Sequence, residues 1–352
     1  MSNPTPEQLR FILQNGILAP SADNHHHLRF DVDQSGVNVW YSGDELPKAG
    51  GYKRVLALLS LGAVSENLTV AASRYGIRAE PVLFPAAGKP SLVFRAVWAP
   101  TDEDVRSLWK EIPRRHTNRN IRYRGPGLPS DDRTRLERVT ETLAGCGLSW
   151  LDDPRTRRQA LGLMRLAEGE RFRNRVLHEE LFGAIRFGVG WRWGCDEGLP
   201  PGALAIEPPL RPAFALLRHW PIMRIVNLAG GYHLLGWRAA DLPCRFAPHL
   251  AVITGRQTDD ATIFSAGRAL QRVWLEITRL GMVLQPMPAS ALYALEGAQQ
   301  EGIPPGLQRR LNQGWDLLLP GRFPLMLFRI GRGAPPTVAT GRKPLESYWL
   351  GG

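Results

Sequence analysis

LGAVSENLTVAASRYGIRAEP, running from Leu61 to Pro81, recurs in outline as AGRALQRVWLEITRLGMVLQP, from Ala266 to Pro286. Both segments carry small and apolar residues at helical spacing and then reach a glycine, which accepts the left-handed cap conformation at least cost. The pattern predicts two long helices in two similar halves of the chain. At a constant offset of 205 positions the segments share Gly62/Gly267, Arg74/Arg279, Gly76/Gly281 and Pro81/Pro286.

An extended run follows each predicted helix after a connector. The first is LVFRAVW, residues 92–98, and the second is LMLFRI, residues 325–330. Their β-branched and aromatic residues are typical of strands. Four identities can arise by chance between two amphipathic helices, but the matched order of elements favours a repeat. We expect one half over residues 1–105 and a second over 106–352, because the polar stretch APTDEDVRSLWKE intervenes.

The composition bounds the class of protein. With 352 residues, 43% hydrophobic and 22% charged, the chain has the make-up of one large or two ordinary folded domains. No run of eighteen uncharged apolar residues predicts a transmembrane helix, and the start MSNPTPEQLR lacks a signal-peptide pattern. Cys146, Cys195 and Cys244 are spaced neither as a disulfide framework nor as a zinc site. We therefore expect a reduced, cytoplasmic protein without a metal.

The net charge of +11 has three readings: a nucleic acid partner, an anionic cofactor, or an arginine-rich composition. No helix-turn-helix, zinc finger or interleaved aromatic and basic strand accompanies the charge. The arginines are dispersed, as in RTRLER and RTRRQ, which indicates solvated helix faces. We expect no nucleic acid partner, because net charge speaks to non-specific attraction alone.

Three short motifs stand out in order along the chain. A helix predicted over 7–18 stops at APSADN, residues 19–24, where proline and turn-forming side chains end it. RRHTNR, residues 114–119, offers guanidinium and hydroxyl donors that suit phosphate. The third motif is FRIG, residues 328–331, which leads through a loop rich in proline and glycine to the basic stretch GRKPLE, residues 341–346. Singly, these are most simply a helix-ending turn, a basic surface loop and an exposed tail.

Taken together, the motifs resemble those of the FMN-binding nitroreductase family. The family's A-P-S-x-x-N-x-Q-P-W loop is similar to residues 19–28, and its R-x-S-x-[RK] phosphate arm to residues 115–119. Its glycine-ended helix resembles residues 267–281, and its C-terminal basic motif before P-L-E resembles residues 342–346. The resemblance covers most of the chain and is weakest over about 176–247.

The resemblance implies an α+β, nitroreductase-like fold. Two tandem halves, each with an antiparallel or mixed sheet flanked by helices, would form an intramolecular pseudo-dimer. Ordinary members are homodimers whose two flavins each take a phosphate arm from one subunit and a loop from the other. Here TPEQLRF is no phosphate arm, and EGERF stands where a second Pro-Ser loop would follow Leu166-Ala167. One FMN per chain is therefore expected, as in the fused, Acg-like branch that residues 179–206 also resemble.

The same resemblance implies the residues around the cofactor. The arginines and the lysine would hold the phosphate and ribityl chain, and the threonine would add a hydroxyl. The serine and the asparagine would bond the isoalloxazine edge or the ribityl hydroxyls, while backbone amides after the second helix would face the pyrimidine side of the ring. These residues are Pro20, Ser21, Asn24, Arg115, Thr117, Arg119, Gly281, Met282, Val283, Leu284, Arg342 and Lys343.

The chain departs from the family after Asn24, where His26-His27-Leu28 replaces Gln-Pro-Trp. Three consecutive histidines are poor metal ligands by spacing, because neighbours on an extended chain point to opposite sides. His26 and His27 are candidates for a flavin-side acid or for substrate contacts, because histidine titrates near neutrality. The plainer reading is that one packs and two are solvated.

Residues 208–237 are apolar but broken by prolines and arginines. A membrane-surface helix would keep a cleaner polar face. We expect helices that cover the second half, within an insertion at about 176–247. They are either a lid that brings Arg218 and His219 near substrate or a packed insertion with no role in chemistry.

The function predicted is that of an FMN-dependent oxidoreductase, with NAD(P)H or another donor, acting on a small or peptide-like organic substrate. The alternative is a non-catalytic protein that sequesters FMN in an occluded site. A third reading is a tailoring enzyme whose reductant is not a pyridine nucleotide. The pseudo-dimer predicts a monomer or a further homo-oligomer.

Overall fold

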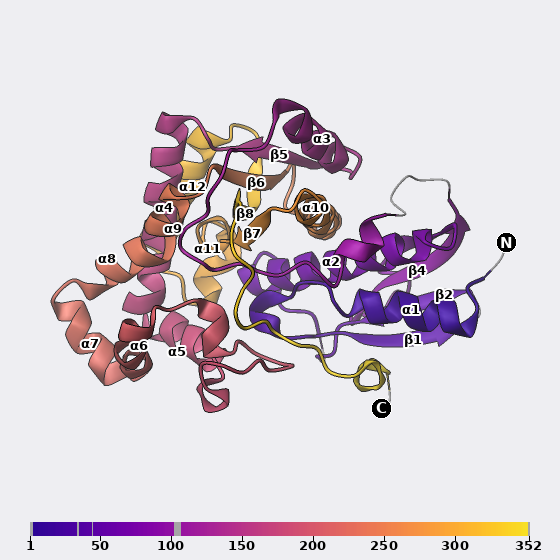
Figure 1. Ribbon diagram of the computed structural model, residues 1–352, viewed down its shortest axis with the longest axis horizontal. Coiled ribbons are helices and arrows are strands. Elements are labelled where there is room, and N and C mark those ends of the chain that lie inside the picture. Colours follow the sequence, from indigo (N-terminus) through magenta and orange to yellow (C-terminus); the bar gives the residue numbers. More distant parts are fainter. Residues whose placement is uncertain (1–2, 34, 44, 102–106, 351–352) are drawn as a thin grey trace.

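Two four-stranded antiparallel sheets and the helices around them make an α+β fold (Figure 1). The computed structural model describes residues 3–33, 35–43, 45–101 and 107–350. The first sheet has the order β1-β2-β4-β3 and comprises β1 (Arg29–Asp33), β2 (Gly36–Trp40), β3 (Ile77–Leu83) and β4 (Leu92–Pro100). The second has the order β5-β6-β8-β7 and comprises β5 (Cys146–Trp150), β6 (His249–Gly255), β7 (Val283–Pro286) and β8 (Phe323–Gly331).

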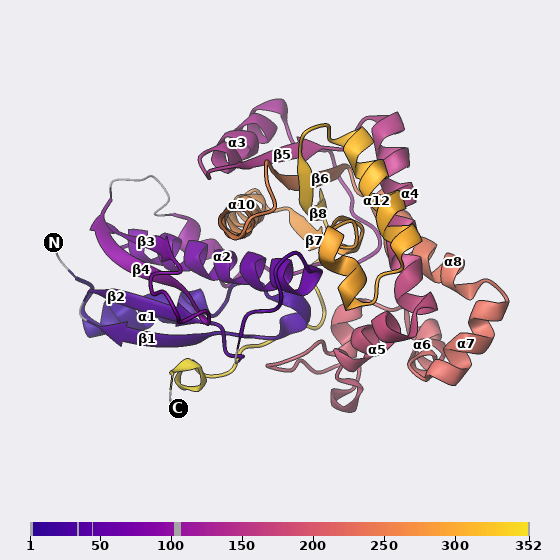
Figure 2. The same cartoon turned by 180° about the vertical axis from the view of Figure 1, so that it is seen from behind.

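The two sheets therefore share one strand order when each is numbered from its own first strand. In each, one long helix connects the second strand to the third: α2 (Tyr52–Ser73) in the first and α10 (Asp260–Arg279) in the second. Figure 2 shows these two helices against each other between the sheets, and they contact each other extensively. The helices predicted from the repeat are thus confirmed.

The contact between α2 and α10 is reciprocal. A Cβ atom on Gly62 would lie closer than 3.0 Å to the carbonyl oxygen of Phe264, and one on Gly267 would lie equally close to that of Leu59. Both pairs obey the offset of 205, because residue 59 corresponds to 264 and residue 62 to 267. Two-fold interfaces have this property, with residue i meeting j while j meets i. The shared glycines let the two backbones approach.

A buried polar cluster flanks this crossing. Glu66 is fully buried and pairs with Arg268 (3.1 Å) and with Arg272, while Gln271 donates to Asn67 (2.6 Å). Burial alone would raise the pKa of Glu66, but the two guanidinium groups outweigh it and hold the pKa below its usual value.

Helix α2 is the one described helix long and apolar enough to cross a membrane by length and composition alone. The most apolar 18-residue stretch of α2 is 83% buried, because the helix packs on α10 and on α1 (Pro6–Gly16). Central helices of folded cores share this composition.

Several local predictions are confirmed and one is wrong. Helix α1 overlaps the helix predicted over 7–18 but begins one residue earlier and ends two earlier, and Gly76 and Gly281 both have positive φ angles, 71° and 67°. The two predicted strands are parts of β4 and β8. The connectors after the glycines are, however, the strands β3 and β7, whose prolines obscured them. The predicted boundary at 105/106 lies outside the described residues.

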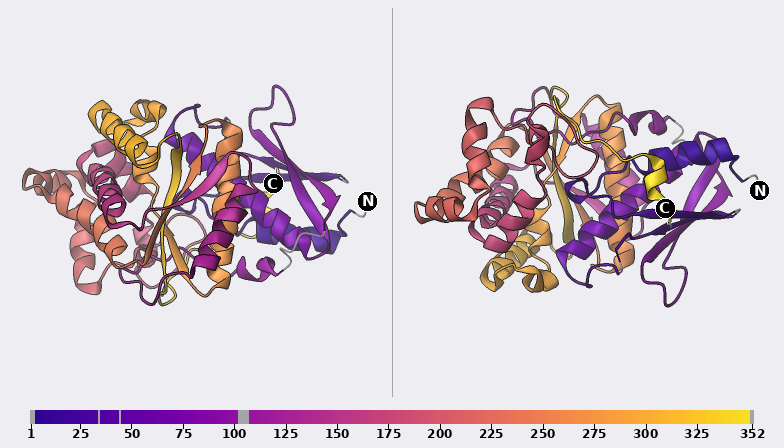
Figure 3. Two further views of the ribbon diagram at one scale, coloured as in Figure 1. Left: turned by 90° about the horizontal axis from the view of Figure 1, so that it is seen from above. Right: turned by 90° about the horizontal axis from the view of Figure 1, so that it is seen from below.

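The region between α4 (Pro154–Arg173) and β6 forms a helical annex at one end of the molecule (Figures 1 and 3). It has a small hydrophobic cluster of its own, which includes Phe182, Ile185 and Met223. Its α-helices are α5 (Arg175–Gly183), α6 (Arg211–Leu217), α7 (Trp220–Leu228), α8 (Gly231–Gly236) and α9 (Leu242–Arg245). Helices α3 (Ser130–Glu141), α11 (Ala289–Leu292) and α12 (Pro305–Leu318) contact strands of the second sheet.

Candidate functional site

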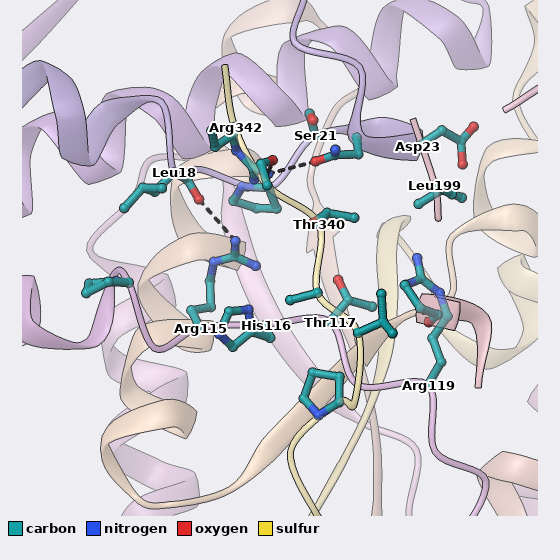
Figure 4. A pocket seen from close by; sticks show the side chains of 18 of the residues that line it. Leu18, Ser21, Asp23, Arg115, His116, Thr117, Arg119, Leu199, Thr340 and Arg342 are labelled. Atoms are coloured by element: carbon teal, nitrogen blue, oxygen red, sulfur yellow. Dashed lines mark hydrogen bonds between the residues drawn. The ribbon is translucent and has the colours of Figure 1, made fainter. Parts of the chain in front are cut away.

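A cavity of about 370 Å³ lies where three segments distant in sequence meet (Figure 4). They are the loop after α1 (residues 18–24), the arm at 112–119 and the C-terminal tail at 336–342. Leu199 and Ala203 of the annex complete the wall. The volume falls in the ordinary range for cofactor and substrate sites.

The loop takes its shape from two left-handed residues. Asp23 and Asn24 have φ angles of 50° and 58°, which asparagine and aspartate tolerate better than other residues with a side chain. Asn24 is buried; its amide nitrogen donates to the carbonyl of Asp196 (3.3 Å), and its amide oxygen accepts from Arg342 (2.7 Å). Asn24 therefore fixes the loop with both ends of its amide.

Arg342 fastens the tail to this loop. Beyond Asn24 it donates to the carbonyl oxygens of Ile17 (2.7 Å), Ala19 (2.8 Å) and Gly341 (2.7 Å). Burial lowers the pKa of Arg342 to about 10. Carbonyl oxygens satisfy its donors but leave its positive charge unneutralised.

Arg115 is the most deeply buried cation of the cavity. It is 6% exposed, stacks over Trp274 at 4.5 Å and donates to the carbonyl of Leu18 at 3.1 Å. Its Nε is buried without a hydrogen-bond partner, and so is the hydroxyl oxygen of Ser21. Burial, followed by the neighbouring charge of Arg342, lowers the pKa of Arg115 to about 9. Buried polar atoms are nearly always partnered in native proteins, so these two indicate a missing acceptor and donor.

Arg119 stands at the other end of the arm, and Thr340 of the tail passes between it and Arg115 in Figure 4. It makes one long bond, 3.4 Å, to the carbonyl of Ala203. Burial lowers its pKa, while Asp23 opposes the shift. Among the described residues, no carboxylate oxygen lies within 4.0 Å of the guanidinium groups of Arg115, Arg119 or Arg342. One buried and two partly buried positive charges without a carboxylate partner favour an anion.

The arm is held rigidly from behind. The backbone amide of Asn118 donates to the carbonyl of Leu284 (3.0 Å), and Thr117 forms a parallel bridge with the same residue. The Asn118 side chain reaches the tail at the carbonyl of Ala334 (2.7 Å). Gly281, Met282, Val283 and Leu284 therefore lie behind the arm and do not line the cavity. The structure brings together Pro20, Ser21, Asn24, Arg115, Thr117, Arg119 and Arg342.

Lys343 also lies outside the cavity lining. Its ammonium group pairs with Glu197 of the annex, which in turn lies 3.7 Å from the ring of His25. The sequence spacing predicts a basic pair that acts together, but adjacent residues of the extended tail point to different sides.

The histidines line a second cavity of about 210 Å³, which shares Pro20, Ser21 and Asp23 with the first. Burial and then the charge of Arg342 lower the pKa of His26 to about 3, and burial and then His25 lower that of His27. The expectation that His26 titrates near neutrality is therefore wrong, and the pKa of His27 is shifted in the same direction. At neutral pH the His26 ring is uncharged and can donate or accept a hydrogen bond.

The sequence reading did not identify the tail residues before Arg342 or the annex residues that pack on them. A Cβ atom on Gly341 of the tail would lie closer than 3.0 Å to Asp196 of the annex, and one on Gly202 of the annex would lie equally close to Val338 of the tail. The Gly341 amide also donates to the carbonyl of Cys195 (2.9 Å). The several glycines of GVGWRWGCDEGLPPGA, residues 188–203, are the feature of the sequence that could have indicated this close packing. Arg218 and His219, which the lid alternative would bring near substrate, bond each other at 3.2 Å outside the cavity lining.

No protein-family profile and no curated protein matches this chain. Among solved structures, the FMN-dependent nitroreductase NfnB of Mycobacterium smegmatis, in complex with NADPH, matches at 17% identity and a TM-score of 0.37, over 69% of this chain and 97% of that one. A nitroreductase with bound FMN from Bacteroides fragilis matches at 12% and 0.33, over 64% and 88%. A BluB-like flavoprotein from Clostridium difficile matches at 10% and 0.36, over 68% and 96%.

In the part of the chain that the structure describes, no three His, Cys, Asp or Glu side chains are grouped to hold a metal.

Proposed function

We propose that this chain binds one FMN in the cavity between loop, arm and tail. The observation that carries the proposal is Arg115, a buried cation with no carboxylate partner and with an Nε that lacks an acceptor. A phosphate dianion supplies both the missing charge and the missing acceptor. Arg119 is the second phosphate or ribityl contact, and the unpartnered Ser21 hydroxyl meets a polar group of the cofactor. Arg342 orders the loop, because its donors are already used within the protein.

The single site follows from an inferred internal pseudo-dimer. The shared strand order of the two sheets and the reciprocal glycine contacts of α2 and α10 support this inference. The loop belongs to the first half, whereas the arm and the tail belong to the second, so the cavity lies at their seam. Neither a second arm nor a second loop is present in the sequence.

The activity proposed is that of a flavin-dependent oxidoreductase of nitroreductase type. A bound flavin supplies hydride chemistry, and the protein binds, orients and shields it. NADPH, the ligand named for the M. smegmatis structure, is the first electron donor to test. The substrate class is a small or peptide-like organic molecule. His26, which is uncharged at neutral pH, and His27 line the adjacent cavity, where their rings offer hydrogen bonds to a substrate.

The second candidate is a flavin-sequestering role. The packing of the annex on the tail favours it, because two close glycine contacts and the bond from Gly341 to Cys195 close one wall of the cavity. Anaerobic stopped-flow mixing with excess NADH or NADPH separates the two candidates. Rapid bleaching of the flavin band supports the oxidoreductase, and a flavin that stays oxidised with both donors supports sequestration.

FMN binding is tested by the visible spectrum of the purified protein and by quantification of released flavin, with about one FMN per chain expected. The Arg115→Ala/Arg119→Ala double variant should lose the bound flavin. The matched control is Arg114→Ala, because Arg114 is the neighbouring arginine and its side chain is 71% exposed. Two FMN per chain, or full occupancy in the double variant, would refute the proposed site.

A further inference from the structure

The outer surface of the annex is apolar and basic. Leu216 of α6, Ile225 and Leu228 of α7 and Leu234 of α8 are 55%, 68%, 86% and 66% exposed. Isolated exposed leucines are ordinary, but four on three consecutive helices are a feature of this region. The three helices lie together at one extremity of the molecule in every view (Figures 1, 2 and 3).

Helix α7 shows how the surface is built. Pro221, Arg224, Ile225 and Leu228 are exposed and stand at i, i+3, i+4 and i+7, which is one face of a helix. Met223 on the opposite face is fully buried in the cluster of the annex. The annex core already uses the inward apolar residues, so the outward ones have no role in folding it. Helix α7 therefore carries apolar residues on both its buried and its exposed face, which is why its sequence lacks the clean polar face of an ordinary surface helix.

The charge of the segment is one-sided. Residues 208–240 contain four arginines and no aspartate or glutamate. Arg218 and Arg224 are exposed, and no carboxylate oxygen of the described residues lies within 4.0 Å of either guanidinium group. They neighbour Leu216 and Ile225 in sequence. Exposed aliphatic side chains beside arginines that lack a carboxylate partner match a surface that is apolar below and anionic above, as the face of a lipid bilayer with acidic headgroups is.

We propose that helices α6, α7 and α8 dock this protein on anionic membrane surfaces, with Ile225, Leu228 and their neighbours entering the headgroup region. A protein partner of equal area would need acidic groups set among apolar ones, and a second copy of this surface would bring arginines against arginines. The lipid surface is therefore the occupant that the charges favour. The cavity between loop, arm and tail is a separate feature, and the docking surface does not depend on what it binds.

The test is co-sedimentation of the full-length protein with vesicles of phosphatidylcholine alone and of equimolar phosphatidylcholine and phosphatidylglycerol. Binding is expected with the anionic vesicles and should weaken as salt is raised. Ile225→Glu/Leu228→Glu should lower the partition coefficient at least about tenfold, because two aliphatic side chains no longer enter the bilayer. Arg218→Gln/Arg224→Gln should lower it about fivefold per arginine.

The matched control is Leu317→Glu on α12, which is 83% exposed and lies outside the annex surface. It should bind as the unmodified protein does, and circular dichroism should show all variants folded. Equal binding to both vesicle types, no binding to either, or an equal loss in the control would overturn the proposal. A dimer in solution that Ile225→Glu/Leu228→Glu converts to a monomer, without vesicle binding by the unmodified protein, would instead assign the surface to a second copy.

Discussion

Replacing Arg115 by methionine should weaken cofactor binding without destabilising the cofactor-free protein. Burial lowers the pKa of Arg115 from 12.5 to about 9, which corresponds to roughly 5 kcal/mol of cost for the charged form. The bond to Leu18 and the stacking on Trp274 offset about 2 kcal/mol each. A net cost of about 1 kcal/mol remains, so methionine, which keeps the apolar stem, should leave unfolding free energy unchanged or slightly higher.

This cost is fully present at neutral pH, because Arg115 is charged at every pH below its folded pKa of about 9. Urea unfolding of flavin-free protein at pH 7 measures it directly. In the same variant, loss of charge-assisted phosphate bonds should weaken FMN binding roughly 10- to 150-fold, as measured by flavin fluorescence titration. Arg114→Met is the control for both measurements. A loss of more than about 2 kcal/mol in cofactor-free stability would mean that Arg115 serves the fold, and unchanged FMN affinity would contradict its proposed role.

Three further outcomes are expected. Gly62→Ala and Gly267→Ala should each cost about 1–3 kcal/mol of unfolding free energy by overpacking the helix crossing, whereas Gly162→Ala, with open space around it, should stabilise by up to about 1 kcal/mol. Folding lowers the pKa of Glu66, so its contribution to the free energy of unfolding is complete above the pKa of the unfolded chain and is lost as pH falls through the pKa of the folded one. Glu66→Gln should therefore lower the free energy of unfolding by about 3–5 kcal/mol near neutrality. Below pH 4.5 the stability of this variant should depend less on pH than that of the unmodified protein. Arg342→Lys keeps the charge but cannot make four bonds, so limited proteolysis should cut the tail faster and FMN affinity should fall.

The sequence permitted prediction of features carried by local pattern. Both long helices, their glycine caps and the strands β4 and β8 follow from periodicity and turn chemistry, and the arm with Arg115 and Arg119 follows from residue type. What a side chain meets across the fold was not predictable. Lys343 reads as a phosphate ligand until Glu197 is found beside it. His26 reads as a titrating group until its burial is known.

The bond from Arg342 to Ile17 spans 325 positions of the chain. At about 5–20 residues per second, a ribosome needs roughly 20–60 s to make the second partner after the first. The loop at 18–24 is therefore made well before Arg342, the residue that anchors it. The cavity therefore cannot be completed until residue 342 has been made, and a chain that stopped between residues 331 and 342 would keep both sheets but have no finished site.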